Sequence, residues 1–244
     1  MKKLLLKFLK TAPFEYYQYL KTRVKRSRSG GLIRKYLKNS QSPKLNIGSG
    51  RNVLPGWLNT DRYPPNTKKE EVVYLDASIR FPFADDTFEF IYSEHIFEHL
   101  EFKDSCNMLA ECYRVLRPGG TMRMAIPHIG FLQELYNRPE APVLKEYISY
   151  SMKDACPEIH EVLGENEHSN IFVINNFYRD WGHQVIHSFG SLKDLIGKFG
   201  FNPIVRKEVS ESEFTELTGL EGNGRGEYPR EFYDVQTLVV EAKK

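Results

Sequence analysis

The stretch "HIFEH" places His95, Glu98 and His99 in the spacing H-x-x-E-H. Histidines four positions apart project from one face of a helix and can share a metal ion, while the glutamate beside them activates bound water. A zinc hydrolase of this kind needs a third ligand, which Glu161 or Glu165 would have to supply. The alternative is that the stretch only ends a strand and begins a helix, so the surrounding motifs must decide.

A short apolar run, "LNIGSG" at residues 45–50, ends in a Gly-Ser-Gly turn. Glycine adopts positive φ and lets a ligand approach the backbone, so such a turn after a strand can hold a cofactor. The third glycine of the dinucleotide fingerprint is missing, and Pro55 and Gly56 stand where a helix would be needed. A dinucleotide cofactor is therefore disfavoured.

Acidic residues end the next two predicted strands. Asp61 is placed to accept hydrogen bonds from ribose hydroxyls, and Asp76, followed by Ala77, is placed to accept one from an adenine amino group. The chain then continues through "FPFADDTFEFIYSEHIFEHL", "ECYRVLRPGG" and "TMRMAIP".

In this order the motifs resemble those of class I S-adenosylmethionine-dependent methyltransferases. The resemblance is strong over residues 44–127 and weaker over 183–242. "LNIGSG" resembles the glycine motif, "LDA" with "FPFADDTFEFIYSEH" the adenine-binding stretch and fourth strand, and "RVLRPGG" the turn before the fifth strand, while "HSFGSLKDLIGKFGF" resembles the late helix leading into the sixth. It implies a Rossmann-like α/β fold with a seven-stranded, mostly parallel sheet.

The resemblance also implies that S-adenosyl-L-methionine is bound by eight residues at the strand ends: Gly48, Ser49, Gly50, Asp61, Asp76, Ala77, Ser93 and Glu94. The glycine turn would line the methionine and ribose, the acid after the second strand would bind the ribose hydroxyls, and the Asp-Ala pair would bind adenine. The alternatives are a tight turn without a ligand for the glycines and a turn or helix cap for Asp76.

Methyl transfer from a sulfonium mainly requires an aligned nucleophile and exclusion of water. A hydroxyl acceptor also benefits from a base that titrates near neutral pH, for which histidine is the usual choice. His95 is the first candidate because it follows the fourth strand by only a few residues, and His128 and His183 are its competitors. Packing is the alternative for each, and His99 is expected to be a packing residue.

The stretches "GSGRNVLPGWLNTDR", "SEHIFEHL" and "MRMAIP" are similar to small methyltransferases associated with bacterial surface-polysaccharide or other glycoconjugate biosynthesis. This similarity implies O-methylation of a sugar or glycoconjugate hydroxyl. The alternative function is a catalytically silent methyltransferase-fold scaffold at a membrane or complex, against which the intact Gly48, Gly50 and Asp76 argue.

Short apolar runs alternating with loops and helices predict a mainly parallel sheet from residue 44 onward. The expected strands span residues 44–47, 57–60, 72–75, 88–92, 121–126, 202–209 and 236–242, and the clearest helices span 93–102, 104–116 and 192–199. Residues 129–186 are too long for a plain crossover and are rich in aromatic side chains. We expect them to form a helical cap over the substrate within a methyltransferase domain spanning 41–244.

Residues 1–40 form a basic amphipathic segment with twelve Lys or Arg and one acidic residue, so the remaining chain carries a net charge of −9. Two interpretations stay open: a helix lying on an anionic membrane surface, or a helix packed against the domain. Only 13 positions separate Gly48 from Asp61, which leaves no room for a covering helix. The N-terminal segment or a homodimer partner must then cover this half of the sheet.

Composition fits a globular protein, with 41% hydrophobic and 27% charged residues and no apolar run long enough to span a bilayer. Three irregularly spaced cysteines fit a reducing compartment. We expect a cytoplasmic enzyme that acts on a small-molecule or glycan acceptor and binds no nucleic acid. Peripheral membrane contact through residues 1–40 follows only if the first of their two interpretations holds.

Overall fold

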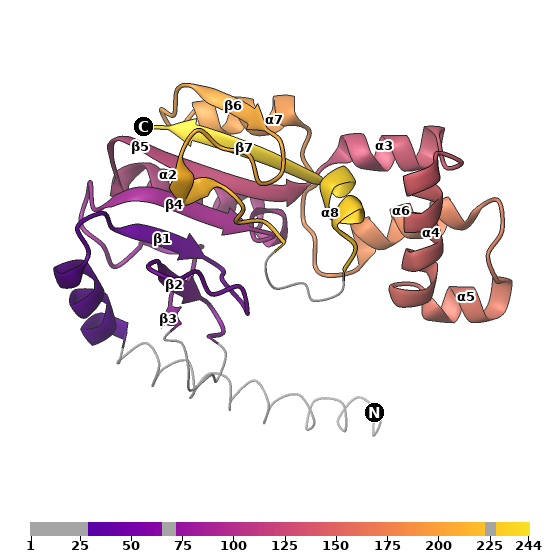
Figure 1. The fold of residues 1–244 in the computed structure, drawn as a ribbon, viewed down its shortest axis with the longest axis horizontal. Helices are drawn as coiled ribbons and strands as arrows, with labels where there is room; N and C mark the ends of the chain where they lie inside the picture. Colours follow the sequence, from indigo (N-terminus) through magenta and orange to yellow (C-terminus); the bar gives the residue numbers. More distant parts are fainter. Residues whose placement is uncertain (1–28, 65–71, 223–227) are drawn as a thin grey trace, which may run out of the picture.

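A seven-stranded sheet forms the centre of the computed structural model, which describes residues 29–64, 72–222 and 228–244 (Figure 1). The strand order is β3-β2-β1-β4-β5-β7-β6. The strands are β1 (Lys44–Ile47), β2 (Leu58–Asp61), β3 (Val73–Tyr74), β4 (Phe88–Glu94), β5 (Leu116–Pro127), β6 (Ile204–Lys207) and β7 (Thr237–Lys243).

Only β7 runs antiparallel to its neighbours β5 and β6, so the expected Rossmann-like, mostly parallel sheet is confirmed. Ile47 of β1 is in register with Ser93 of β4, and Thr60 of β2 is in register with Val73 of β3. Because β1 to β4 are parallel, the residues that follow them meet at one edge of the sheet.

The helix expected over residues 93–102 is absent. β4 continues to Glu94, His95 turns the chain with a φ of 50°, and a single 3-10 turn, η1 (Phe97–His99), precedes α2 (Phe102–Val115). The β-branched and aromatic run before Ser93 extends the strand, and a left-handed residue cannot continue into a helix. The helical i,i+4 geometry assumed for His95 and His99 therefore does not exist.

Two hydrophobic clusters cover the two faces of the sheet. Leu45 and Ile47 of β1 pack with α2, α7 (Phe189–Gly197) and residues 29–39 in one cluster. On the opposite face, Tyr92 packs with Trp57 and with Leu217 and Leu220 from the segment after β6, which includes η2 (Thr215–Leu217). Helix α7 begins after Ser188, whose side chain accepts from the backbone N–H of Ser191, so the helix starts three residues before the expected start at residue 192.

Residues 29–39 of the basic N-terminal segment form a helix on the main core. Ile33 is buried in that core, with 6% of its surface exposed. The hydroxyl of Tyr36 lies 3.0 Å from the carbonyl oxygens of Lys44 and Gly56, and it accepts from the N–H of Lys44. This part of the segment therefore covers the shortened half of the sheet, whereas residues 1–28 lie outside the described residues. Among the described helices, none is long and apolar enough to cross a membrane.

The insertion after β5 forms four helices: α3 (Ile129–Asn137), α4 (Pro142–Asp154), α5 (Pro157–Leu163) and α6 (Ser169–Arg179). They lie beyond the end of the sheet, with α8 (Arg230–Gln236) between them and the strands (Figure 1). Phe131, Tyr147 and Phe177 form the centre of a separate hydrophobic cluster, which Phe232 of α8 joins. The insertion is thus a helical unit with its own core, placed at the strand edge as expected.

A buried ionic cluster connects β5 to β7 and to the segment before α8. The guanidinium of Arg123 is fully buried, and it donates to the carboxylates of Glu221 and Glu241, the latter at 2.6 Å. Both glutamates are at most 4% exposed. Removing one partner of this cluster would strongly destabilise the fold, because a buried unpaired charge would remain.

Arg123→Ala is expected to lower the free energy of unfolding by about 3–5 kcal/mol, since two buried carboxylates lose their cation. Urea unfolding followed by circular dichroism measures the change. Lys145→Ala, which breaks a surface pair with Glu140 in which both side chains are more than two-thirds exposed, should cost less than about 1 kcal/mol. Equal losses in the two variants would contradict a structural role for the buried cluster.

Candidate functional site

Hydrogen bonds from two backbone N–H groups hold the glycine turn after β1 against β2. The N–H of Ser49 donates to the carbonyl of Thr60 at 2.8 Å, and the N–H of Gly50 donates to a carboxylate oxygen of Asp61 at 2.9 Å. Gly48 and Gly50 have φ of 71° and 50°. The hydroxyl of Ser49 is buried and has no hydrogen-bond partner among the described residues, which fits a turn that binds a polar ligand.

Position 48 requires glycine for two reasons: its φ is positive, and the side chain of Ile96 lies too close for a Cβ. A Cβ at this position would lie 2.2 Å from side-chain carbons of Ile96, the residue after His95. The turn after β1 and the turn after β4 are therefore packed against each other.

Gly48→Ala is expected to destabilise the fold by about 2–4 kcal/mol, because a left-handed alanine and an overpacked contact with Ile96 add together. Thermal unfolding measures this. Gly119→Ala has a similar φ of 80° but open space around the Cβ, so it should cost only the conformational part of about 1–2 kcal/mol. A Gly48 variant no less stable than the Gly119 variant would contradict the close packing.

The two acidic strand ends lie beside this turn and also shape their own loops. Asp61 accepts from the N–H groups of Gly50 and Tyr63, and Asp76 accepts from the N–H and hydroxyl of Ser78. The second carboxylate oxygen of Asp76 lies 3.4 Å from the guanidinium of Arg62. Asp76 therefore caps the turn at Ser78 through one oxygen, while its second oxygen pairs with Arg62 and has a further lone pair for a ligand.

A cavity of about 310 Å³ lies next to Asp76, between residues 75–82 and the helix of residues 29–39. Its walls combine the apolar side chains of Ile33, Leu75 and Ile79 with the cations Arg34 and Arg80. Apolar side chains beside a carboxylate suit an adenine ring, whose amino group donates. The helix wall was not expected from the sequence, because Ile33 comes from the basic segment outside the recognised motifs.

Ser93 and Glu94 end β4 at the same edge. Ser93 is 2% exposed, and the carboxylate of Glu94 accepts from the Asn52 side chain, the N–H of Gly222 and the hydroxyl of Tyr233 at 2.6 Å. Glu94 thus connects the loop after the glycine turn to α8. Ala77 is partly buried against the main core, and its carbonyl accepts from an asparagine of α2.

His95 forms a dyad with Glu98. The Nδ1 of His95 lies 2.8 Å from a carboxylate oxygen of Glu98, which is fully buried. Burial alone would raise the pKa of Glu98, but the hydrogen bond and charge of His95 outweigh it and hold this pKa below its usual value. A carboxylate at Nδ1 fixes the tautomer, so the Nε2 of His95, which has no partner among the described residues, is available as a base.

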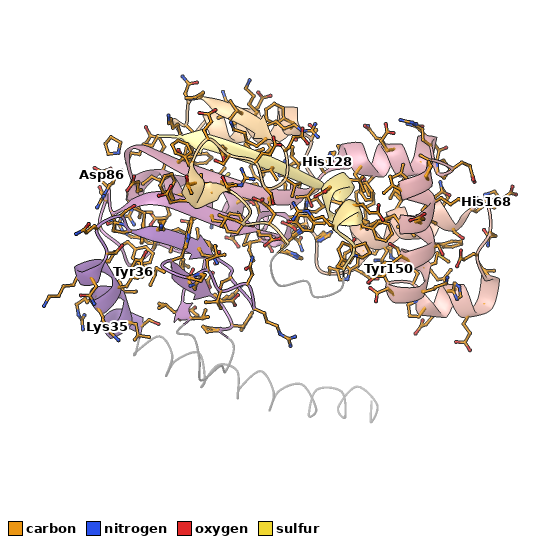
Figure 2. All side chains as sticks on the ribbon, viewed as in Figure 1. Lys35, Tyr36, Asp86, His128, Tyr150 and His168 are labelled. Atoms are coloured by element: carbon orange, nitrogen blue, oxygen red, sulfur yellow. The ribbon has the colours of Figure 1, made fainter. Side chains whose placement is uncertain are left out.

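A cavity of about 340 Å³ lies between this dyad, the insertion and α8. Its described lining combines histidines and an acidic group with aromatic rings: His95, His99, Pro127, Tyr147, Tyr150, Ser151, Asp154, Ala155, Phe177, Trp181, His183, Tyr228 and Gln236. Tyr150 lies at the junction of the insertion with α8 (Figure 2), and its ring is 5.6 Å from that of Phe232. The insertion therefore closes over the end of β4.

Of the three candidate bases, His95 and His183 line this cavity, whereas His128 does not. His128 lies near the ends of β5 and β7 (Figure 2), where burial and the charge of Arg206 lower its pKa. His99 lines the cavity as well, and its ring centroid is 4.8 Å from that of His183. Burial also lowers the pKa of His183.

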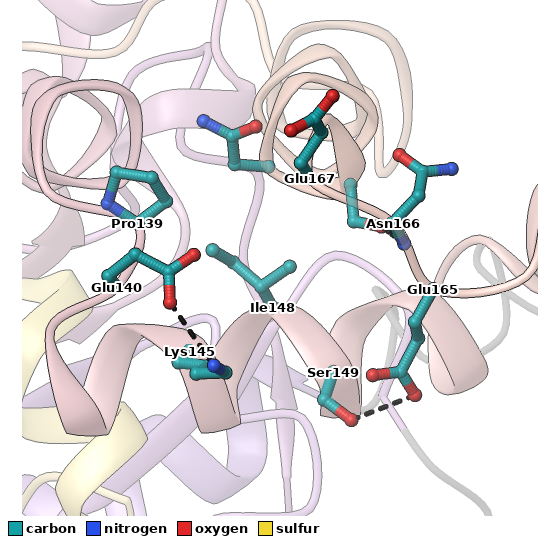
Figure 3. Close-up of a pocket in the computed structure, with 10 residues that line it drawn as sticks. Pro139, Glu140, Lys145, Ile148, Ser149, Glu165, Asn166 and Glu167 are labelled. Atoms are coloured by element: carbon teal, nitrogen blue, oxygen red, sulfur yellow. Dashed lines mark hydrogen bonds and ion pairs between the residues drawn. The ribbon is translucent and has the colours of Figure 1, made fainter.

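A further hollow of about 320 Å³ lies on the outside of the insertion, between α4 and residues 165–167 (Figure 3). Figure 3 shows Lys145 paired with Glu140 and Ser149 bonded to Glu165 on its walls. It shares no lining residue with the two cavities at the sheet edge. Glu165, one of the two expected third zinc ligands, is therefore not part of the H-x-x-E-H region.

Residues 56–124 match the family described as a methyltransferase domain. No curated protein sequence matches the chain. A methyltransferase structure from Archaeoglobus fulgidus is 17% identical, with a TM-score of 0.46, over 95% of this chain and 99% of that one. One from Thermotoga maritima is 17% identical, with a TM-score of 0.44, over the whole of both chains.

The domain match runs from β2 into β5 and includes Asp61, Asp76 and the His95 dyad. In the mostly parallel sheet, the turn after β1 has a buried hydroxyl with no partner among the described residues, and a cavity containing the Asp76 carboxylate lies after β3. These residues fit S-adenosylmethionine, whose sulfonium supplies the methyl group. Residues 56–124 therefore carry a methyltransferase domain match, and the surrounding residues fit the S-adenosylmethionine cofactor of that class of domain.

Proposed function

We propose that the protein is an S-adenosylmethionine-dependent methyltransferase that methylates a hydroxyl group of a sugar or glycoconjugate bound beneath the helical insertion. The observation that carries this proposal is the His95–Glu98 dyad facing an aromatic, polar cavity at the end of β4. A hydroxyl nucleophile must lose its proton as the methyl group is transferred, and the dyad supplies an oriented base for that proton.

The cavity's chemistry favours a neutral, hydroxyl-rich acceptor. Aromatic rings such as Tyr150 and Trp181 offer flat apolar surface for the C–H faces of a sugar. The hydroxyl of Ser151 can donate or accept hydrogen bonds, and the carboxylate of Asp154 can accept them. No lysine or arginine is present among its described lining residues, so a phosphate there would lack the basic side chains that usually bind it. A pyranose hydroxyl therefore fits better than a phosphorylated acceptor.

The proposed reaction is a direct transfer of the methyl group from sulfur to the acceptor oxygen. The acceptor oxygen forms a bond to the methyl carbon as the carbon–sulfur bond breaks, and the electron pair stays on sulfur to give S-adenosylhomocysteine. The hydroxyl proton passes to Nε2 of His95, and Glu98 stabilises the resulting imidazolium through Nδ1. The apolar insertion excludes water from this step.

A methyl-transfer screen tests the proposal. Purified enzyme, S-adenosylmethionine labelled in the methyl group, and panels of neutral sugars, sugar phosphates and uronic acids would be incubated together. The proposal expects label in a neutral sugar as a methyl ether, which survives mild base. Label released as methanol under those conditions would identify a carboxyl ester and contradict a hydroxyl acceptor.

A further inference from the structure

Three potential metal ligands meet at the edge of the acceptor cavity. One ligand atom each from Glu98, His99 and His183 lies within 4.8 Å of the other two. Glu98 and His99 come from η1, whereas His183 comes from the end of the insertion more than eighty residues later. Only the tertiary structure brings these three residues together.

The backbone holds His183 in this position. The N–H of Gln184 donates to the carbonyl of Glu98 at 2.7 Å, and the N–H of Val185 makes a longer contact to the same oxygen. Just before His183, Trp181 and Gly182 both have positive φ, of 58° and 76°, which turns the chain toward η1. The histidine is thus fixed against η1 by main-chain contacts.

The hydrogen bonding of His183 leaves one ring nitrogen free for a metal. Its Nδ1 lies 2.7 Å from the carbonyl oxygen of Phe177, which can only accept, so Nδ1 carries the hydrogen. The lone pair is then on Nε2. Metal-binding histidines almost always donate their other N–H to a carbonyl or carboxylate in this manner.

Glu98 provides a second, independent indication. Its side chain is fully buried, and while Oε1 pairs with His95, Oε2 has no hydrogen-bond partner among the described residues. An unsatisfied buried carboxylate oxygen is costly, because it has lost its hydration. A cation beside it would remove that cost, and the Nε2 of His99 lies 3.9 Å from the same carboxylate.

We propose that Glu98, His99 and His183 bind a zinc ion at the edge of the acceptor cavity. Two imidazoles and one carboxylate form a common catalytic zinc set that keeps a coordination position open. This set differs from the H-x-x-E-H pattern, because His183 takes the place that the sequence spacing gives to His95. His95 keeps its contact with Glu98 and remains the base.

The role of the ion rests on the proposed function, whereas its binding does not. In the open position a zinc ion would bind the acceptor hydroxyl and lower its pKa, so that the proton moves more readily to Nε2 of His95. The oxygen would then attack the methyl carbon as before, and the ion would neither gain nor lose an electron.

Zinc titration of the metal-free enzyme tests the site. Full-length protein without a histidine tag would be treated with a chelator, dialysed and titrated with zinc chloride in a calorimeter. We expect about one ion per chain, and cobalt(II) in place of zinc should give the visible absorption of a four-coordinate site. No saturable zinc binding by the folded wild-type protein would overturn the proposal.

Variants then locate the site. His183→Ala and His99→Ala are each expected to weaken zinc binding by about 100-fold or more, since each removes a ligand. His160→Ala is the matched control, because His160 lies 3.7 Å from the carboxylate of Glu165 on the insertion surface. Zinc affinity unchanged in both ligand variants, or lowered equally in the control, would place the ion elsewhere and refute the assignment.

The outcome for zinc can be separated from that for methyl transfer. Zinc binding that depends on His183, in a protein that methylates no hydroxyl acceptor, would support the metal site and contradict the proposed function. Hydroxyl methylation by chelated protein at the rate of the zinc-loaded protein would support the proposed function and contradict a catalytic role for the ion.

Discussion

His95→Ala is expected to lower kcat for methyl transfer about 10²–10⁴-fold, because the acceptor proton loses its base. The affinity for S-adenosylmethionine should stay within about twofold, since the ring faces the acceptor cavity rather than the cavity beside Asp76. Single-turnover kinetics give the rate, and calorimetry gives the affinity. A variant with full activity would show that His95 is not the base.

A second variant, His95→Asn, controls for the backbone conformation at residue 95. With a φ of 50°, this residue is left-handed, a conformation that asparagine tolerates better than alanine does. His95→Asn should therefore preserve the turn after β4 and still lose the base, so its kcat should fall as far as that of the alanine variant. Recovery of activity in His95→Asn would assign the loss in His95→Ala to backbone strain.

Asp76→Ala is expected to weaken S-adenosylmethionine binding about 100-fold, because a charged acceptor in the wall of the cavity is removed. The same change also removes the cap on Ser78, so part of the loss comes from the loop. Calorimetry with S-adenosylmethionine measures the affinity, and circular dichroism confirms the fold.

Asp76→Asn separates these two contributions. An asparagine can keep its carbonyl oxygen toward Ser78, so the loop stays capped, but its amide would face an amino group with another donor. We expect nearly the full loss of affinity in this variant. Asp86→Ala, at an exposed residue that lines neither cavity, should bind S-adenosylmethionine normally. Wild-type affinity in Asp76→Asn would exclude the Asp76 carboxylate from cofactor recognition.

The sequence predicted the sheet well because its signals are local. Short apolar runs ending in glycine or aspartate marked β1, β2 and β3 to within two residues, and parallel pairing then brought their ends together. The turn at Gly48 and the acids at Asp61 and Asp76 lie at one edge for this reason.

The arrangement around His95 could not be predicted in the same way. The polar residues after Tyr92 suggested a helix, but the pairing of Ser93 and Glu94 with β5 extends the strand, and a left-handed residue follows. The meeting of His183 with η1 depends on hydrogen bonds between segments far apart in the sequence. The sequence pattern of either segment alone gives no indication of this contact.

A crystal structure of the enzyme with S-adenosylhomocysteine tests the central claim most directly. We predict adenine in the cavity beside Asp76 and the sulfur at the Gly48–Gly50 turn, directed toward Nε2 of His95 and the cavity beneath the insertion. A cofactor bound away from the ends of β1 to β4, or a sulfur directed away from that cavity, would contradict the account.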